Sequence, residues 1–228
     1  MVENLQDIRA SIDLIDDQLL DLICRRMELS AAVASAKSGG VTYRPGREAE
    51  VFLRLAEQAP DLPAGIARNI WRQIMTASSA QQDRSIGVAV LDRALPTASW
   101  HFGGQLSLIQ CNAISACSAA MQEGAAYALV PVSEDAALAG WLMQDQDLHI
   151  IAVTPFEVMS DDGDGLPPCY VIGRTEADSV RHETTLIACG DADLAHIEAC
   201  PGRPVDVLAG YAMPARIAGV IATSPKTD

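Results

Sequence analysis

The longest uninterrupted helical pattern in the sequence covers the N-terminal segment from Asn4 to Ser38. Its apolar residues recur at steps of three and four, which is the spacing of one face of an α-helix, and glycine first appears after it, at Gly39 and Gly40. A helix of this length extends roughly 50 Å at ~1.5 Å per residue. Because a lone helix that long is not stable in water, it must pack against other helices. We expect some of these to come from a second subunit.

Two shorter helices are predicted to follow the first one. Pro45 suits the first turn of a helix over residues 45–58, and a second apolar periodicity predicts a helix over residues 64–83. Residues 1–84 are therefore predicted to form a three-helix domain. The polar stretch from Gln81 to Ser85 is predicted to be a hinge after it.

The remaining residues, 85–228, follow a different pattern, in which short apolar runs alternate with helical segments. The predicted strands are residues 86–91, 105–111, 127–132, 149–156, 169–174, 184–190, 205–210 and 216–223. The predicted helices are Asn112–Gln122, with Asn112 as N-cap, and Ser133–Met143. This alternation predicts an α + α/β chain, in which a small α/β domain with a partly parallel sheet follows the helical domain.

The negative charge of the chain is unevenly distributed. The formal net charge is −14, with 16 Lys and Arg against 30 Asp and Glu. Residues 1–84 contain 10 basic and 12 acidic side chains, which leaves 6 basic and 18 acidic ones for residues 85–228. Such a balance argues against a nucleic-acid partner. A small anionic ligand is easier to place in the N-terminal part.

The sequence also gives expectations about the compartment. No apolar run reaches the roughly 18 residues of a membrane span, and the acidic N-terminus lacks the basic and apolar regions of a signal peptide. The six cysteines form no CxxC pair and lie among apolar neighbours, which predicts free, buried thiols in a reducing compartment. The histidines show no metal-ligand spacing. We therefore expect a cytoplasmic protein with no metal and no cofactor.

Cations and polar side chains on the predicted helices share faces. Arg26 and Lys37 lie about three turns, or about 16 Å, apart on one face of the first helix. Ser78 and Gln82 are four residues apart on one face of the third helix. Arg9 lies about 25 Å from Arg26 and is turned roughly 100° away. One small ligand cannot contact both arginines of one chain, so a contribution from Arg9 predicts a dimer.

These residues form part of a longer motif. The patterns LxxIRxxIDxIDxxLLxLxxRRxxLxxxVAxxK, RPxRE and IWxxIxxxSxxxQ over residues 4–83 resemble the all-helical, type II chorismate mutase family. The resemblance implies an intertwined homodimer that binds chorismate in shared cationic sites. It implies the following site residues: Arg9 from the partner subunit, Arg26, Lys37, Arg47, Glu48, Ser78 and Gln82.

The implied reaction suits these residue types. Conversion of chorismate to prephenate is a concerted rearrangement, which needs a folded substrate conformer and stabilisation of charge on the ether oxygen. Arginine forks suit the two substrate carboxylates, and Ser78 would support one of them. Lys37 and Gln82 would donate to the ether oxygen. Glu48 would accept from the ring hydroxyl.

Other polar residues of this region have different expected roles. Arg44 departs from the family pattern, because many members have an acidic residue there that contacts the substrate hydroxyl. Trp71 is expected in the core, and Tyr43 and Arg44 either line the site entrance or lie in an exposed loop. Four arginines are expected to form surface salt bridges: Arg25, Arg54, Arg68 and Arg72.

The C-terminal part resembles a reduced prephenate dehydratase domain, through FGGQLSLIQCNAISACSAAMQEGAAYALVPVSED and YVIGR. Motif positions of that family fall on Pro167, Pro168, Glu134 and Asp135, and the stretch between the two segments is too short for a second lobe. We therefore expect a non-catalytic domain that regulates the mutase or binds a partner enzyme. The alternatives are a bifunctional mutase–dehydratase and an isochorismate pyruvate-lyase on the same scaffold.

Overall fold

The computed structural model of the chain describes residues 4–36, 43–83, 85–156, 165–175, 180–181, 183–190, 195–201 and 215–222. Three helices form its N-terminal part: α1 (Leu5–Ala36), α2 (Pro45–Gln58) and α3 (Ala64–Gln82). Their positions confirm the three predicted helices. No helix among the described residues is long and apolar enough to cross a membrane.

The C-terminal part is a mixed sheet with helices, which confirms the predicted α/β class. Its strands are β1 (Gly87–Leu91), β2 (Ser107–Cys111), β3 (Tyr127–Pro131), β4 (His149–Thr154), β5 (Cys169–Gly173), β6 (Glu183–Cys189), β7 (His196–Pro201) and β8 (Ala215–Ala222). Its helices are η1 (Asp92–Ala94), α4 (Leu95–Phe102), α5 (Ile114–Gln122), η2 (Val132–Glu134) and α6 (Asp135–Gln144).

All eight strands belong to one sheet in the order β2-β1-β3-β5-β4-β8-β6-β7. β1 pairs in parallel with β2 and β3, and β4 pairs in parallel with β8, while the other pairings are antiparallel. β8 lies so close to β4 that a Cβ atom on Gly219 would clash with the carbonyl oxygen of Ile150. Only glycine fits at that position.

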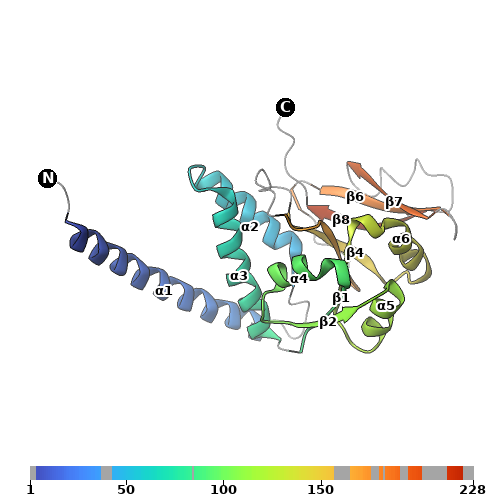
Figure 1. Cartoon of the computed structure of the whole chain (residues 1–228), viewed down its shortest axis with the longest axis horizontal. Helices are drawn as coiled ribbons and strands as arrows, with labels where there is room; N and C mark the ends of the chain where they lie inside the picture. The colour runs from blue at the N-terminus through green and yellow to red at the C-terminus, as the bar shows by residue number, and fades with distance from the viewer. Residues whose placement is uncertain are drawn as a thin grey trace.

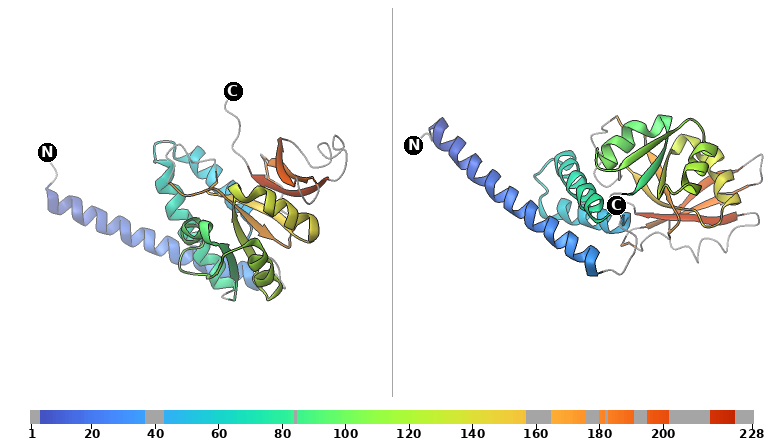
Figure 2. Two further views of the ribbon diagram at one scale, coloured as in Figure 1. Left: turned by 45° about the vertical axis from the view of Figure 1, so that its right-hand side comes forward. Right: turned by 90° about the horizontal axis from the view of Figure 1, so that it is seen from below.

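Helices cover both faces of the sheet, and alternate strand residues face opposite cores. Val88 and Val90 of β1 pack with α2, α3 and α4, whereas Ala89 and Leu91 pack with α5 and α6. The first of these cores also contains Phe52 of α2. Helices α2 and α3 therefore share a hydrophobic core with the sheet on which they pack (Figures 1 and 2). The domain boundary at residue 84 stays a prediction.

The first helix leads away from the rest of the chain (Figure 1). Its C-terminal half packs against α3, but its apolar side chains are largely exposed along its whole length, for example Ile15 at 54% and Leu19 at 51%. An exposed apolar row of this kind marks an interaction surface.

Several sequence expectations need correction or lie outside the described residues. The sequence did not predict α4 or β7. Asn112 was predicted to be the N-cap of α5, but Ala113 occupies that position and forms no side-chain cap hydrogen bond. Cys24 is exposed rather than buried, while the other five free cysteines are buried or half-buried. The predicted strand at 205–210 lies outside the described residues.

Candidate active site

A cavity of about 470 Å³ opens between α1, α2 and α3. It is lined by Arg26, Val33, Arg44, Arg47, Glu48, Val51, Arg54, Trp71, Met75, Ser78, Ser79 and Gln82. The lining thus combines four arginines and one carboxylate with apolar and neutral polar side chains. Such a site suits a small anion that also has an apolar surface.

The contact between α1 and α3 brings three predicted site residues together. The Arg26 guanidinium donates to Ser78 Oγ at 2.8 Å, and that hydroxyl donates to the Ile74 carbonyl at 2.8 Å. Gln82 Nε2 donates to Ser30 Oγ at 2.9 Å. Burial lowers the pKa of Arg26, and the charge of Glu48 opposes this shift. Arginine remains a cation in either case.

α2 and the residue before it add further cations to the cavity. Arg47 has a largely exposed side chain and forms an ion pair with Glu50 at 3.3 Å. Arg44 and Arg54 also line the cavity, although only Arg47 of these three was predicted to bind substrate. Arg54 was expected to be a surface residue. It is exposed, and its side chain also borders the cavity.

Glu48 is buried and forms a two-pronged ion pair with Arg72. The two guanidinium nitrogens lie 2.7 Å from the two carboxylate oxygens. Burial alone would lower the pKa of Arg72, but the charge and hydrogen bonds of Glu48 raise it on balance. Arg68 and Arg72 are only 2% and 1% exposed, so their predicted surface positions are wrong. Arg68 lies over the ring of Trp100 on α4, and Arg72 joins α3 to Glu48 on α2.

Replacing Glu48 by glutamine is expected to destabilise the fold by about 3 kcal/mol, because it leaves the buried Arg72 cation without its counterion. Chemical denaturation monitored by circular dichroism measures this change. The matched control is Glu50→Gln, which removes the exposed carboxylate beside Arg47 and should change stability by less than about 1 kcal/mol. Equal denaturation midpoints for the two variants would contradict the expectation.

The remaining predicted residues occupy different positions. Lys37 lies outside the described residues. Arg9 is exposed on α1 and does not line the cavity, so its role in a partner's site stays a prediction. Trp71 is half-buried, lines the cavity and packs against the core as expected. Tyr43 is 3% exposed, which excludes the predicted exposed loop position.

A second cavity of about 470 Å³ lies at the carboxyl ends of β1, β2 and β3. Among its described lining residues, Arg93 is the only cation, and it forms an ion pair with Glu134 at 3.2 Å. Asp92 also lines this cavity and accepts a hydrogen bond from Gln110 at 2.9 Å. The excess of carboxylates makes this cavity unfavourable for an anionic substrate.

A third polar group lies at the β6–β7 edge of the sheet. Ligand atoms of Cys189, His196 and Glu198 lie within 4.8 Å of one another, and Cys189 is directly opposite His196 across the strand pair. A thiolate, an imidazole and a carboxylate are ligands that suit Zn²⁺. Burial and the charge of Glu198 raise the pKa of the Cys189 thiol, so binding would have to displace a proton. The sequence does not indicate this group, because its members meet only through strand pairing.

Comparisons with known proteins agree with the geometry of the N-terminal part. Residues 8–83 match the family model described as chorismate mutase type II. The "T-protein" of Enterobacter agglomerans is 36% identical over 87 residues, which cover 35% of this chain and 23% of that protein. The N-terminal helical region therefore fits a type II chorismate mutase domain, and this enzyme class is supported for it.

Two further matches extend over more of the chain. The "bifunctional chorismate mutase/prephenate dehydratase" of Neisseria gonorrhoeae (strain ATCC 700825 / FA 1090) is 28% identical over 130 residues, which cover 54% of this chain and 36% of that protein. The chain therefore spans about a quarter to a third of the length of these curated relatives. A solved structure described as "GqqA- a novel type of quorum quenching acylases" is 14% identical and covers 61% of this chain and 96% of its own, with a TM-score of 0.40.

Proposed function

We propose that the protein is a chorismate mutase that converts chorismate to prephenate in aromatic amino acid biosynthesis. The observation that carries this proposal is the convergence of Arg26, Ser78 and Gln82 on one arginine-lined cavity. That cavity lies within the region that matches the type II family. The charge of the cavity also suits the substrate, because chorismate is a dianion.

The cavity supplies what the rearrangement needs. One carbon–oxygen bond breaks while one carbon–carbon bond forms, without a nucleophile or a proton transfer. Arg26 and Arg47 bind the two carboxylates, which holds the substrate in its folded reactive conformer. Gln82 and Lys37 donate to the ether oxygen, where negative charge develops. Glu48 lines the cavity, and its remaining lone pairs can accept from the ring hydroxyl.

The proposed functional unit is a homodimer in which α1 of each subunit reaches the other subunit's site. The exposed apolar residues of α1 support it, because a row of that length needs a complementary helix. Arg9 supports it as well, since it lies on the same helix beyond the reach of its own cavity. The partner's Arg9 would complete the substrate contacts.

The test of the proposal is turnover of chorismate by the full chain, followed as loss of chorismate absorbance. Lys37→Ala should lower kcat by about 100-fold or more, because it removes a donor to the developing charge. Lys226→Ala removes the only other lysine of the chain and should leave turnover unchanged. An inactive wild-type protein, or a Lys37→Ala variant with full activity, would refute the assignment.

The alternative of a bifunctional mutase–dehydratase has support from the length of one sequence match. The 130-residue alignment with the bifunctional relative is longer than the helical region of residues 1–84 and must include part of the α/β domain. A dehydratase activity would release phenylpyruvate from prephenate. The carboxylates of the second cavity, Asp92 and Glu134, argue against it. Assays for phenylpyruvate from prephenate, and for pyruvate from isochorismate, separate both alternatives from the mutase.

A further inference from the structure

One face of helix α3 borders the cavity, and a second face packs against the α/β domain. Trp71, Met75, Ser78 and Gln82 border the cavity. The face that contains Arg68, Arg72 and Thr76 lies about 100° further around the helix axis and is buried. This second face packs against α4 of the α/β domain. The positions of the cavity residues on α3 therefore depend on the contacts between α3 and α4.

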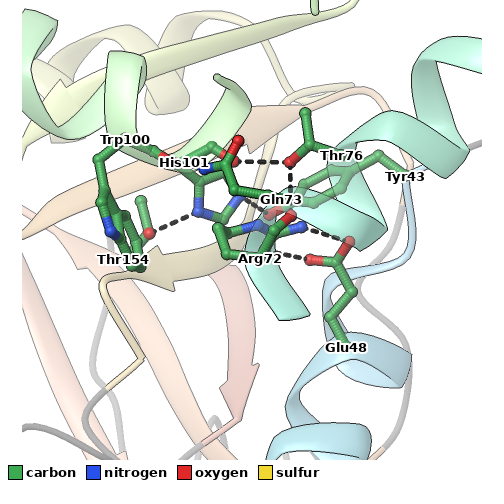
Figure 3. Close-up of polar contacts among 8 residues, drawn as sticks. All are labelled: Tyr43, Glu48, Arg72, Gln73, Thr76, Trp100, His101 and Thr154. Carbon is green, nitrogen blue, oxygen red and sulfur yellow. Dashed lines mark hydrogen bonds and ion pairs between the residues drawn. The ribbon is translucent and has the colours of Figure 1, made fainter. Parts of the chain in front are cut away.

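The contact between α3 and α4 is specific. The Arg68 guanidinium lies 5.5 Å from the ring centroid of Trp100, whose indole nitrogen donates to Asn69 Oδ1 at 2.8 Å. The Thr76 hydroxyl donates to the His101 carbonyl at 2.9 Å (Figure 3). Such contacts between polar groups require definite distances and directions, so they favour one register of the two helices.

His101 also contacts the segment that precedes α2. Its Nε2 atom lies 2.9 Å from the Tyr43 hydroxyl, and its Nδ1 atom lies 2.7 Å from Thr154 Oγ1 on β4 (Figure 3). The imidazole is fully buried. Burial and the charge of Arg72 hold the pKa of His101 well below its usual range, so the ring is neutral. A neutral ring accepts at one nitrogen and donates at the other, which matches its two hydroxyl partners.

Tyr43 is held by the α/β domain at a second point. Burial raises the pKa of the Tyr127 phenol on β3, and the nearby backbone of Tyr43 partly offsets this shift. The Tyr43 ring also packs edge-on against the rings of Phe102 and Tyr127, with centroids 5.8 Å and 5.3 Å apart. The backbone immediately before α2 is therefore fixed by α4 and β3 together.

The first turn of α2 follows directly from this anchored residue. Pro45 and Gly46 are buried, Glu48 is bound by Arg72, and Phe52 packs on Phe156 with ring centroids 5.7 Å apart. Arg47 lies between these buried residues and is itself exposed at the cavity. Its direction is thus set by neighbours that the α/β domain holds.

We propose that the α/β domain is a working part of the chorismate mutase site and that His101 is its positioning residue. The imidazole of His101 contacts Tyr43 and so fixes the start of α2, while its backbone carbonyl accepts from Thr76 and so fixes the register of α3. These two contacts set the positions of Arg47, Glu48 and Ser78 in the cavity. The proposal rests on the proposed mutase function. It replaces the view of residues 85–228 as an appendage to an autonomous mutase.

Two variants of the full chain test this role with minimal change in volume. Tyr43→Phe removes only the hydroxyl bound to His101 Nε2, and Thr154→Val removes only the partner of Nδ1. Each should lower kcat/KM for chorismate by about 10- to 100-fold, because small displacements of substrate-contacting groups have effects of that size. Tyr170→Phe is the matched control: its ring lies in the other core, with α5 and α6, and it should keep wild-type kcat/KM.

A coupling measurement separates positioning from general loss of structure. If Tyr43 acts through Arg47, then Tyr43→Phe should lower activity much less in an Arg47→Ala background than in the wild type. Circular dichroism melts confirm that each variant is folded at the assay temperature. If the wild type is active but Tyr43→Phe and Thr154→Val keep its kcat/KM, this inference is wrong while the proposed function stands. The same holds if the effects of Tyr43→Phe and Arg47→Ala on kcat/KM are fully additive. An inactive wild type overturns the proposed function and this inference with it.

Discussion

A mixture of two weakly active variants, Arg9→Ala and Arg26→Ala, is expected to regain chorismate mutase activity. Each variant alone should lose about 100-fold or more in kcat/KM, because each lacks one cation at every site. In a mixed dimer, however, one site contains both substitutions and the other contains neither. Random exchange of subunits therefore restores about a quarter of the wild-type sites in a two-fold symmetric dimer. Chorismate turnover after joint unfolding and refolding measures this recovery.

Two controls make the complementation experiment decisive. Arg26→Ala mixed with the double variant Arg9→Ala/Arg26→Ala contains no intact site in any dimer and should stay inactive. Arg25→Ala removes the exposed neighbour of Arg26 and should keep wild-type turnover by itself. If the first mixture recovers no activity although mixed dimers form, Arg9 does not act in the partner's site.

Replacing Gln82 by glutamate is expected to make the mutase strongly dependent on pH. Only a protonated carboxyl can donate to the ether oxygen, and the unperturbed pKa of glutamate is about 4.3. At pH 7.5 the variant should therefore have lost about 10³-fold in kcat/KM relative to the wild type. The loss should shrink about tenfold for each unit by which the pH falls, until that pKa is reached.

The matched control for this experiment is the neighbouring residue. Gln81→Glu introduces the same charge one position earlier, where the side chain is exposed and does not line the cavity. Its ratio of kcat/KM to that of the wild type should stay constant with pH. A Gln82→Glu variant with an equally flat ratio would show that Gln82 does not donate to the developing charge.

The helical part of the fold could be predicted from local signals. The apolar period of α1, Pro45 at the start of α2 and the period of α3 are all contained in short windows of sequence. The strands were visible as apolar runs for the same reason. By contrast, α4 has only eight residues, which is too short for a periodic pattern to stand out.

The sequence could predict those candidate site residues whose positions follow from the periodicity of their own helix. Arg26, Ser78 and Gln82 share faces at regular spacing, and the structure brings them to one cavity. The ion pair of Glu48 and Arg72 could not be predicted, because the two residues are 24 positions apart on different helices. An arginine on an amphipathic helix is usually solvated, and nothing local distinguishes Arg72 from that case.

The contact of Tyr43 with His101 could not be predicted from the sequence either. These residues are 58 positions apart, and their meeting depends on how the helices pack on the sheet. The sequence pattern divides at residue 84 because the periodicity changes there from helix to strand. The core does not divide there, since Phe52 and Val88 belong to the same cluster.

That shared core has a consequence for gene fusion and protein engineering. A chimera joined at residue 84 would place α2 and α3 on a foreign sheet, without His101 as the partner of Tyr43 and without Phe156 as the partner of Phe52. The smallest unit that can be exchanged as a whole begins before Tyr43 and includes the α/β domain. Recombination at this boundary would carry most of the residues that line the candidate cavity along with the sheet, and would leave α1 as the replaceable part.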